Sequence, residues 1–139
     1  MRIPIVASLL LATVAGHASA MDATDVATYR IISVKNEPTQ KLFRLSGGPG
    51  IWRIEDKRPD GTWEDVTCQG GCKLEESKEQ DIKRFFPVDD LSSVKMTCLH
   101  NNAFAFCRYS RNSEGGKRGY VFVALTEQYP IPLRLEREK

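Results

Sequence analysis

The sequence is poor in histidine, with His17 and His100 as its only two. Serine and cysteine nucleophiles need a base within reach, and many zinc sites use histidine ligands. His100 is the only histidine beyond the first 20 residues. A histidine-rich metal site is therefore excluded there, and a nucleophile would have a single candidate base.

Motifs that bind cofactors are missing as well. The glycine run at residues 46–50 matches neither the dinucleotide-binding nor the phosphate-loop pattern, and it leads into a strand pattern rather than a helix. The sequence has no C-x-x-C-H haem motif, no C-x-x-C redox pair and no calcium-binding loop. We therefore expect no cofactor and no metal.

Long hydrophobic runs are confined to the N-terminus. Arg2 is followed by an apolar run over residues 3–15 and by the small residues ASA at 18–20. This order is typical of a secretory signal peptide, and the run falls short of the roughly 20 apolar residues of a membrane span. We predict a signal peptide over residues 1–20, cleavage after Ala20, and a mature chain over 21–139 that is periplasmic or secreted.

Neither sign of charge dominates. The chain has 20 Lys and Arg residues against 18 Asp and Glu, and one of these cations, Arg2, lies in the predicted signal. Such a balance creates no field that would attract nucleic acid or an anionic membrane. We expect one domain of ordinary size, with no nucleic-acid partner and no membrane span.

The four cysteines all lie in the mature part, at Cys68, Cys72, Cys98 and Cys107. An even number in a small exported chain indicates disulfides, because the compartment oxidises thiols. The spacing does not repeat as a zinc site requires, and the pair in CQGGC is one residue too wide for a thioredoxin-type site. Four cysteines allow three connectivities, so spacing alone does not decide the pairing.

Local geometry favours the pairs Cys68–Cys72 and Cys98–Cys107. The segment VKMTCLHNNAFAFCRYSR predicts two strands around a polar turn. A two-residue loop at Asn102 and Ala103 would place Cys98 opposite Cys107 as a closely spaced, non-hydrogen-bonded pair. A four-residue loop would instead make Cys98 and Cys107 a hydrogen-bonded pair, whose Cα atoms lie farther apart.

Alternating and β-branched segments between turn residues predict about eight short strands. We place them at residues 29–34, 42–45, 51–56, 62–67, 94–99, 104–109, 120–125 and 131–135. The clearest hairpin turns at RPDG, residues 58–61. Pro130 and Pro132 should confine the last strand to an edge or a loose segment. Residues 21–27 are expected to be a loose N-terminus.

One segment has helical rather than strand periodicity. Ile82, Phe85 and Phe86 share a helical face, Ser77 and Gln80 match a capping box, and Pro87 follows. We predict a short helix at about residues 78–86, packed on the sheet. The whole indicates a mainly β (α+β) domain, with a strongly curved antiparallel sheet or small barrel. An open α+β sheet is the alternative.

The strongest candidate binding site surrounds the loop at residues 110–119. Arg and Tyr are common in binding hot spots, and loops carried by rigid strands often perform recognition. The predicted partner-binding residues are Arg108, Tyr109, Arg111, Lys117, Arg118 and Tyr120. The alternative is that a glycine-containing loop simply needs polar residues on its surface.

The sequence thus favours an exported, non-enzymatic binding protein of inhibitor or immunity type, with a protein or cell-envelope partner. One alternative is a small-ligand carrier, with an apolar cavity lined by Trp52, Phe104, Phe106 and Phe122. A third is a hydrolase that uses the turn carboxylates Asp56, Asp60, Glu64 and Asp65. A Cys98–His100 dyad would require a free thiol, so we expect His100 to be a surface residue beside a turn.

Overall fold

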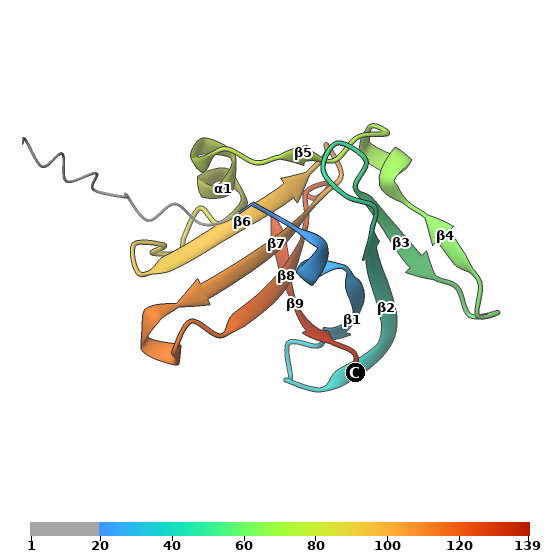
Figure 1. Ribbon diagram of the computed structural model, residues 1–139, viewed down its shortest axis with the longest axis horizontal. Helices are drawn as coiled ribbons and strands as arrows, with labels where there is room; N and C mark the ends of the chain where they lie inside the picture. Colours follow the sequence, from blue (N-terminus) through green and yellow to red (C-terminus); the bar gives the residue numbers. More distant parts are fainter. Residues whose placement is uncertain (1–19) are drawn as a thin grey trace, which may run out of the picture.

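The computed structural model describes residues 20–139, which form a curled antiparallel sheet with one α-helix (Figure 1). The strands are β1 (Ala27–Ile32), β2 (Pro38–Ser46), β3 (Arg53–Lys57), β4 (Trp63–Asp65), β5 (Glu75–Glu76), β6 (Val94–His100), β7 (Phe104–Arg111), β8 (Arg118–Ala124) and β9 (Ile131–Arg137). The helix is α1 (Glu79–Phe85), and the 3-10 helices are η1 (Ala23–Asp25), η2 (Thr67–Gly70) and η3 (Asn112–Glu114). The predicted signal peptide, except Ala20, lies outside the described residues.

The strand order is β4-β3-β2-β1-β9-β8-β7-β6-β5, and every neighbouring pair is antiparallel. Strands that follow one another in sequence are paired, except that β4 and β5 lie at opposite ends of the sheet, and β9 pairs with β1 as well as with β8. The sheet curls into a half-barrel, with β1–β4 facing β6–β8 across its hollow side (Figure 1). The predicted mainly β domain with a strongly curved sheet and one short helix is confirmed.

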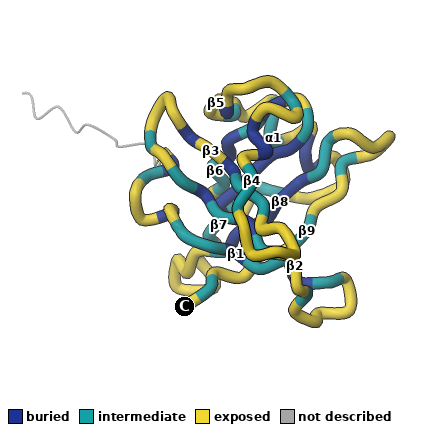
Figure 2. Tube along the Cα trace, turned by 90° about the vertical axis from the view of Figure 1, so that its right-hand side faces the viewer, coloured by how far each residue is buried: buried dark blue, intermediate teal, exposed yellow. Residues whose placement is uncertain are grey.

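Strand alternation divides the apolar side chains between two cores. The inner core fills the hollow side of the sheet and comprises Met21, Tyr29, Phe43, Leu45, Trp52, Ile54, Val66, Leu74, Leu99, Phe104, Phe106, Tyr120, Phe122 and Leu135. The outer core lies under α1 and comprises Phe85, Phe86, Cys98, Ala105, Cys107, Val121 and Val123. Buried backbone accordingly concentrates in the middle of the molecule (Figure 2). β7 and β8 therefore carry buried apolar residues on both of their faces.

Two predicted hairpins are also confirmed. β3 and β4 pair across the RPDG turn, where Arg58 N donates to Thr62 O at 2.8 Å. In the β6–β7 hairpin Cys98 lies opposite Cys107 with a Cα–Cα distance of 4.1 Å, and the two are disulfide-bonded. Cys68 and Cys72 form the second disulfide. Both predicted pairs are present.

β9 differs from the prediction of an edge strand. It lies inside the sheet, between β8 and β1. Its two partners are staggered, however: Ile131 to Leu135 pair with β8, whereas β1 pairs only with Leu135, Glu136 and Arg137. Pro132 therefore lies where β9 pairs with β8 alone. Because β1 does not reach this position, the missing N–H of Pro132 removes no hydrogen bond to β1.

The helix begins differently from the predicted capping box. Lys78 is the N-cap residue, and its backbone N–H donates to the Asp81 carboxylate at 2.9 Å. Ser77 instead extends β5, and its N–H donates to Cys98 O at 2.9 Å. The Ser-x-x-Gln pattern was overridden because β6 offers a backbone acceptor beside Ser77. Within residues 20–139 no helix is long and apolar enough to cross a membrane.

The predicted loose N-terminus is wrong. Met21 is only 1% exposed and belongs to the inner core. η1 follows, capped by Asp22, whose carboxylate accepts from Thr24 N at 2.8 Å. Residues 20–26 cross the hollow side between the two halves of the sheet before β1 begins (Figure 1).

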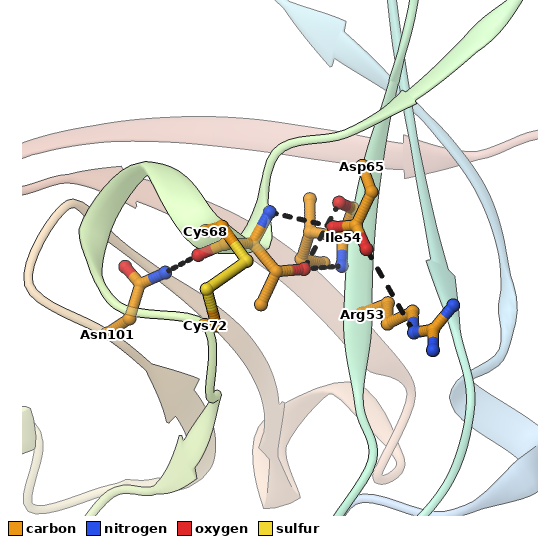
Figure 3. The surroundings of a disulfide bond; sticks show 7 residues. Arg53, Ile54, Asp65, Cys68, Cys72 and Asn101 are labelled. Carbon is orange, nitrogen blue, oxygen red and sulfur yellow. Dashed lines mark hydrogen bonds and ion pairs between the residues drawn. A yellow bond between two sulfur atoms is a disulfide. The ribbon is translucent and has the colours of Figure 1, made fainter.

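The segment after β4 connects the two ends of the curled sheet (Figure 3). Thr67 Oγ1 accepts from Ile54 N in β3 at 3.0 Å, and Thr67 O accepts from Asn101 Nδ2 at 2.8 Å. Asn102 N also donates to Gly70 O at 2.9 Å. Since β4 and β5 do not pair, η2 joins these ends by turn and side-chain hydrogen bonds instead of a strand ladder. The Cys68–Cys72 disulfide fixes the turn that makes the contact.

Gly70 is required by this contact. A Cβ at Gly70 would lie 2.3 Å from Ala103 N, which is backbone and cannot move aside cheaply. We expect Gly70→Ala to lower the free energy of unfolding by about 1–3 kcal/mol, as overpacking does elsewhere. Urea denaturation measures this loss. Gly48→Ala is the matched control, because nothing lies within 4 Å of its Cβ position; an equal effect in both variants would contradict the prediction.

Candidate functional site

The six predicted binding residues do not form one surface, because strand alternation divides them. Arg108, Arg118 and Tyr120 point to the hollow side, where they contact Asp25. Tyr109 lies on the opposite face, against the outer core, and Arg111 lies over its ring. Lys117 precedes β8 in the connecting loop.

The hollow-side residues are anchored by a buried carboxylate. Asp25 and Arg108 are 0% and 5% exposed, and Arg108 Nη1 donates to Asp25 Oδ2 at 2.5 Å. Tyr120 Oη donates to Asp25 Oδ1 at 2.8 Å, and Tyr29 Oη donates to the Asp25 backbone oxygen. Burial alone would penalise either charge, so the paired charges and the surrounding donors compensate one another. Arg108 and Tyr120 therefore hold the N-terminal segment.

Two more arginines hold the same segment from its solvent side. Arg118 Nη1 donates to Thr24 Oγ1 at 2.5 Å and lies 3.5 Å from Asp25 Oδ1. Arg137 Nη1 donates to Thr24 O at 2.8 Å. Burial raises the pKa of Tyr29 and of Tyr120, so both phenols stay protonated as donors over the physiological range. The cluster thus ties η1 to β1, β7, β8 and β9.

The other half of the predicted set is accessible. The Arg111 side chain is 49% exposed, and its closest described acid is Glu114, with a nitrogen–oxygen distance of 3.9 Å. Lys117 is exposed and makes no ion pair with any residue in 20–139. The Tyr109 ring packs over Gly119, where a Cβ would lie 2.3 Å from Cζ. This close approach fixes the tyrosine ring between the two strands.

The disulfides leave no thiol for chemistry within the described residues. Cys98 and Cys107 are buried, and Cys98 is therefore unavailable as a nucleophile for the Cys98–His100 dyad. Cys68 and Cys72 are exposed and close the turn of η2. Within residues 20–139, no three His, Cys, Asp or Glu side chains are grouped to hold a metal ion.

His100 differs from the predicted surface residue. It is half-buried, its ring contacts the edge of Phe85 at 5.3 Å, and its Nδ1 lies 2.6 Å from Ser77 Oγ. Hydrolytic triads use the other ring nitrogen for the serine and orient this one with a carboxylate. Together with the Ser77–Cys98 backbone bond, the contact joins the start of α1 to β6.

The turn carboxylates that could support hydrolysis have local partners. Asp56 pairs with Lys41 at 2.9 Å, and Glu64 pairs with Arg58 at 2.5 Å. Asp60 accepts from the hydroxyl and backbone of Thr62, which lowers its pKa. Asp65 accepts from Thr67 N at 2.9 Å. Asp56 and Glu64 lie opposite each other on β3 and β4, but each acid has a local partner that accounts for it as part of a turn or of the strand pairing.

The aromatic residues proposed to line a carrier cavity pack on other core residues. Phe122 stacks on Phe104 at 5.2 Å and on Phe43 at 4.8 Å. Phe106 contacts Tyr29 at 5.1 Å, and Trp52 is 4% exposed within the same core. Their packing gives the carrier hypothesis no support.

The described residues do form a hollow, but on the outer side of the sheet. It measures about 910 Å³ and lies between α1, the loop at 86–93 and β6. Its apolar lining residues include Ile82, Phe86, Leu91, Val94 and Met96, and its charged ones are Glu76, Glu79, Lys83, Asp89, Asp90 and Lys95. The sequence carries no signal for this hollow, because Ile82 and Phe86 have the same spacing as ordinary core residues.

Asp25 was also missed, although the D-x-x-D pattern of Asp22 and Asp25 is a local signal for a capped turn. We expect Asp25→Asn to lower the free energy of unfolding by about 3–5 kcal/mol, because it removes one charge of the buried Asp25–Arg108 ion pair. Urea unfolding measures the change. Asp89→Asn is the matched control, since Asp89 is exposed. Equal stability of the two variants would show that the cluster contributes little.

Comparison of the chain with protein-family models, with curated proteins and with solved structures found no match. The functional conclusion therefore depends on the geometry of the chain itself.

Proposed function

We propose that the chain is an exported, non-enzymatic binding protein of the inhibitor type. Its recognition surface is Tyr109, Arg111 and Lys117, at the loop end of the β7–β8 hairpin. The partner is a protein or envelope component that presents acidic groups to these cations. Export is supported by the two disulfides, which oxidising compartments permit, and we place the mature chain in the periplasm.

The observation that carries this proposal is the division of the basic residues. Arg108 and Arg118 are engaged by Asp25, whereas Arg111 and Lys117 extend into solvent from the same hairpin. The Asp25 cluster holds the strands in place, so the exposed cations are displayed on a rigid support. A pre-organised surface loses less conformational entropy on binding, which favours affinity.

The residue types also suit recognition. Arg111 lies 5.8 Å from the Tyr109 ring, so the guanidinium is partly ordered before any partner arrives. An arginine can bind a carboxylate through two parallel hydrogen bonds, and Tyr and Arg are enriched in binding hot spots. Acidic groups on the partner would pair with the positive charges of Arg111 and Lys117.

We expect the double variant Arg111→Ala/Lys117→Ala to lose affinity for the natural partner. Truncation of hot-spot residues costs about 1–2 kcal/mol each, or about 2–4 kcal/mol for the pair, so the Kd should rise about 30- to 900-fold. The partner is captured with the mature protein from its own cell envelope, purified, and titrated calorimetrically. Added salt should weaken the unmodified complex, because exposed charges are screened.

Lys35→Ala/Lys73→Ala is the matched control, because both lysines are exposed and lie outside this surface. This control variant also removes two positive charges, but from another part of the surface, and should bind the partner with unchanged affinity. Unchanged affinity of the Arg111/Lys117 variant for the captured partner would refute the proposed surface.

A further inference from the structure

Among the residues that the structure describes, the edge of β6 away from β7 has a strand neighbour only near its end. β5 pairs only with Leu99 and His100, and Ser77 N extends this contact to Cys98 O. Towards its beginning, β6 faces the hollow beneath α1, which Val94, Lys95 and Met96 help to line. α1 and β6 lie side by side at this end of the sheet (Figure 1).

The direction of the backbone groups on β6 follows from its pairing with β7. The short Cα distance of 4.1 Å between Cys98 and Cys107 is that of a non-hydrogen-bonded pair. Cys98 O bonds to Ser77 N, on the side away from β7, and so confirms this parity. By the period of two, the N–H and C=O of Met96 also point away from β7. Among the described residues neither group has a backbone partner on that side.

We infer that this edge and the hollow form a binding site for an extended peptide segment that adds to β6 as a further strand. Main-chain hydrogen bonds to Met96 would supply affinity, as in other cases of strand addition. Alternate side chains of the added strand would point towards α1, where Ile82, Phe86 and Leu91 give an apolar floor. The site is separate from Tyr109, Arg111 and Lys117 and does not depend on them.

Charge around the hollow selects a basic segment. Its rim has four acids, Glu76, Glu79, Asp89 and Asp90, against the two lysines Lys83 and Lys95. Glu79 pairs with Lys83 at 3.5 Å, which leaves Lys95 against the remaining three acids. The occupant that fits is therefore a strand in which apolar residues alternate with lysine or arginine.

The first test uses two synthetic peptides, acetyl-Lys-Val-Lys-Val-Lys-amide and acetyl-Glu-Val-Glu-Val-Glu-amide. Each is titrated into the ¹⁵N-labelled mature protein and followed by amide chemical shifts. The lysine peptide should bind about tenfold or more tightly than the glutamate peptide, with shift changes in β6 and α1. Equal affinities, or shift changes that avoid β6, would overturn the proposal.

The second test examines strand addition without altering the protein. The lysine peptide is prepared in two forms, N-methylated at its odd or at its even residues. Only one set of amides faces β6, because successive N–H groups of a strand point to opposite sides. One form should bind about tenfold more weakly and the other normally. If both forms bind as the parent peptide does, the peptide does not pair with β6.

The third test changes the protein. Met96→Pro removes an N–H from the open edge and leaves the β7 ladder intact, so the lysine peptide should bind about tenfold more weakly. Asp89→Lys/Asp90→Lys, at exposed positions, should weaken the lysine peptide similarly and improve the glutamate peptide. Glu37→Lys/Glu127→Lys is the matched control for charge, and both residues are exposed and outside the hollow.

Two other occupants are separate outcomes. Ala20 lines the hollow, so a peptide of residues 11–20 is titrated in parallel. Tighter binding of that peptide than of the lysine peptide would assign the site to the chain's own leader and overturn the proposal. Self-association through β6, detected by sedimentation, would assign it to a second copy and also overturn it. The Arg111→Ala/Lys117→Ala variant should bind the lysine peptide normally, so failure of the proposed function leaves this test interpretable.

Discussion

The curl of the sheet depends on the hydrogen bonds that Thr67 makes to β3 and to the β6–β7 turn. Its hydroxyl accepts from Ile54 in β3, and its carbonyl oxygen accepts from Asn101 beside the β6–β7 turn. An open antiparallel sheet exposes its edges, and a barrel removes them by pairing the first strand with the last. Here the four-residue η2 takes the place of that pairing, with Gly70 against Ala103 at the closest point. The exposed Cys68–Cys72 disulfide holds this turn in shape, so its role is structural.

With the two ends of the sheet joined, the inner core needs only a cover on its hollow side. Residues 21–26 provide it: Met21 is buried in the core, and Asp25 is bound by Arg108 and Tyr120. A buried ion pair contributes little net stability compared with apolar residues, yet breaking it is costly. The cluster therefore specifies where the N-terminal segment lies, and it engages Arg108 and Arg118, half of the basic residues near the β7–β8 loop, with Asp25. The proposed recognition surface therefore consists of Tyr109 on the outer face and of Arg111 and Lys117 at the loop.

Sequence predicted the features that depend on neighbouring residues and missed those that depend on distant ones. The RPDG hairpin, the Cys98–Cys107 register and the apolar face of α1 follow from turn chemistry and periodicity, and the structure confirms them. The bond from Arg108 to Asp25 spans 83 residues, and no periodic pattern encodes it. Alternation could have separated Arg108 from Tyr109 and Arg111, because successive strand residues face opposite sides. Ser77 shows the converse limit, since a helix-capping pattern was overridden by an acceptor on β6.

Both proposed binding surfaces require that η2 keeps the two ends of the half-barrel joined. Native-state hydrogen exchange tests this requirement most directly. The Ile54 N–H donates to Thr67 Oγ1, and the Asn102 N–H donates to Gly70 O. If these bonds close the half-barrel, both amides should exchange only through global unfolding, with the same opening free energy as the core amide of Phe106. Exchange of Ile54 and Asn102 at a much lower opening free energy than Phe106 would show that η2 detaches locally. That result would contradict the closure of the sheet by this segment.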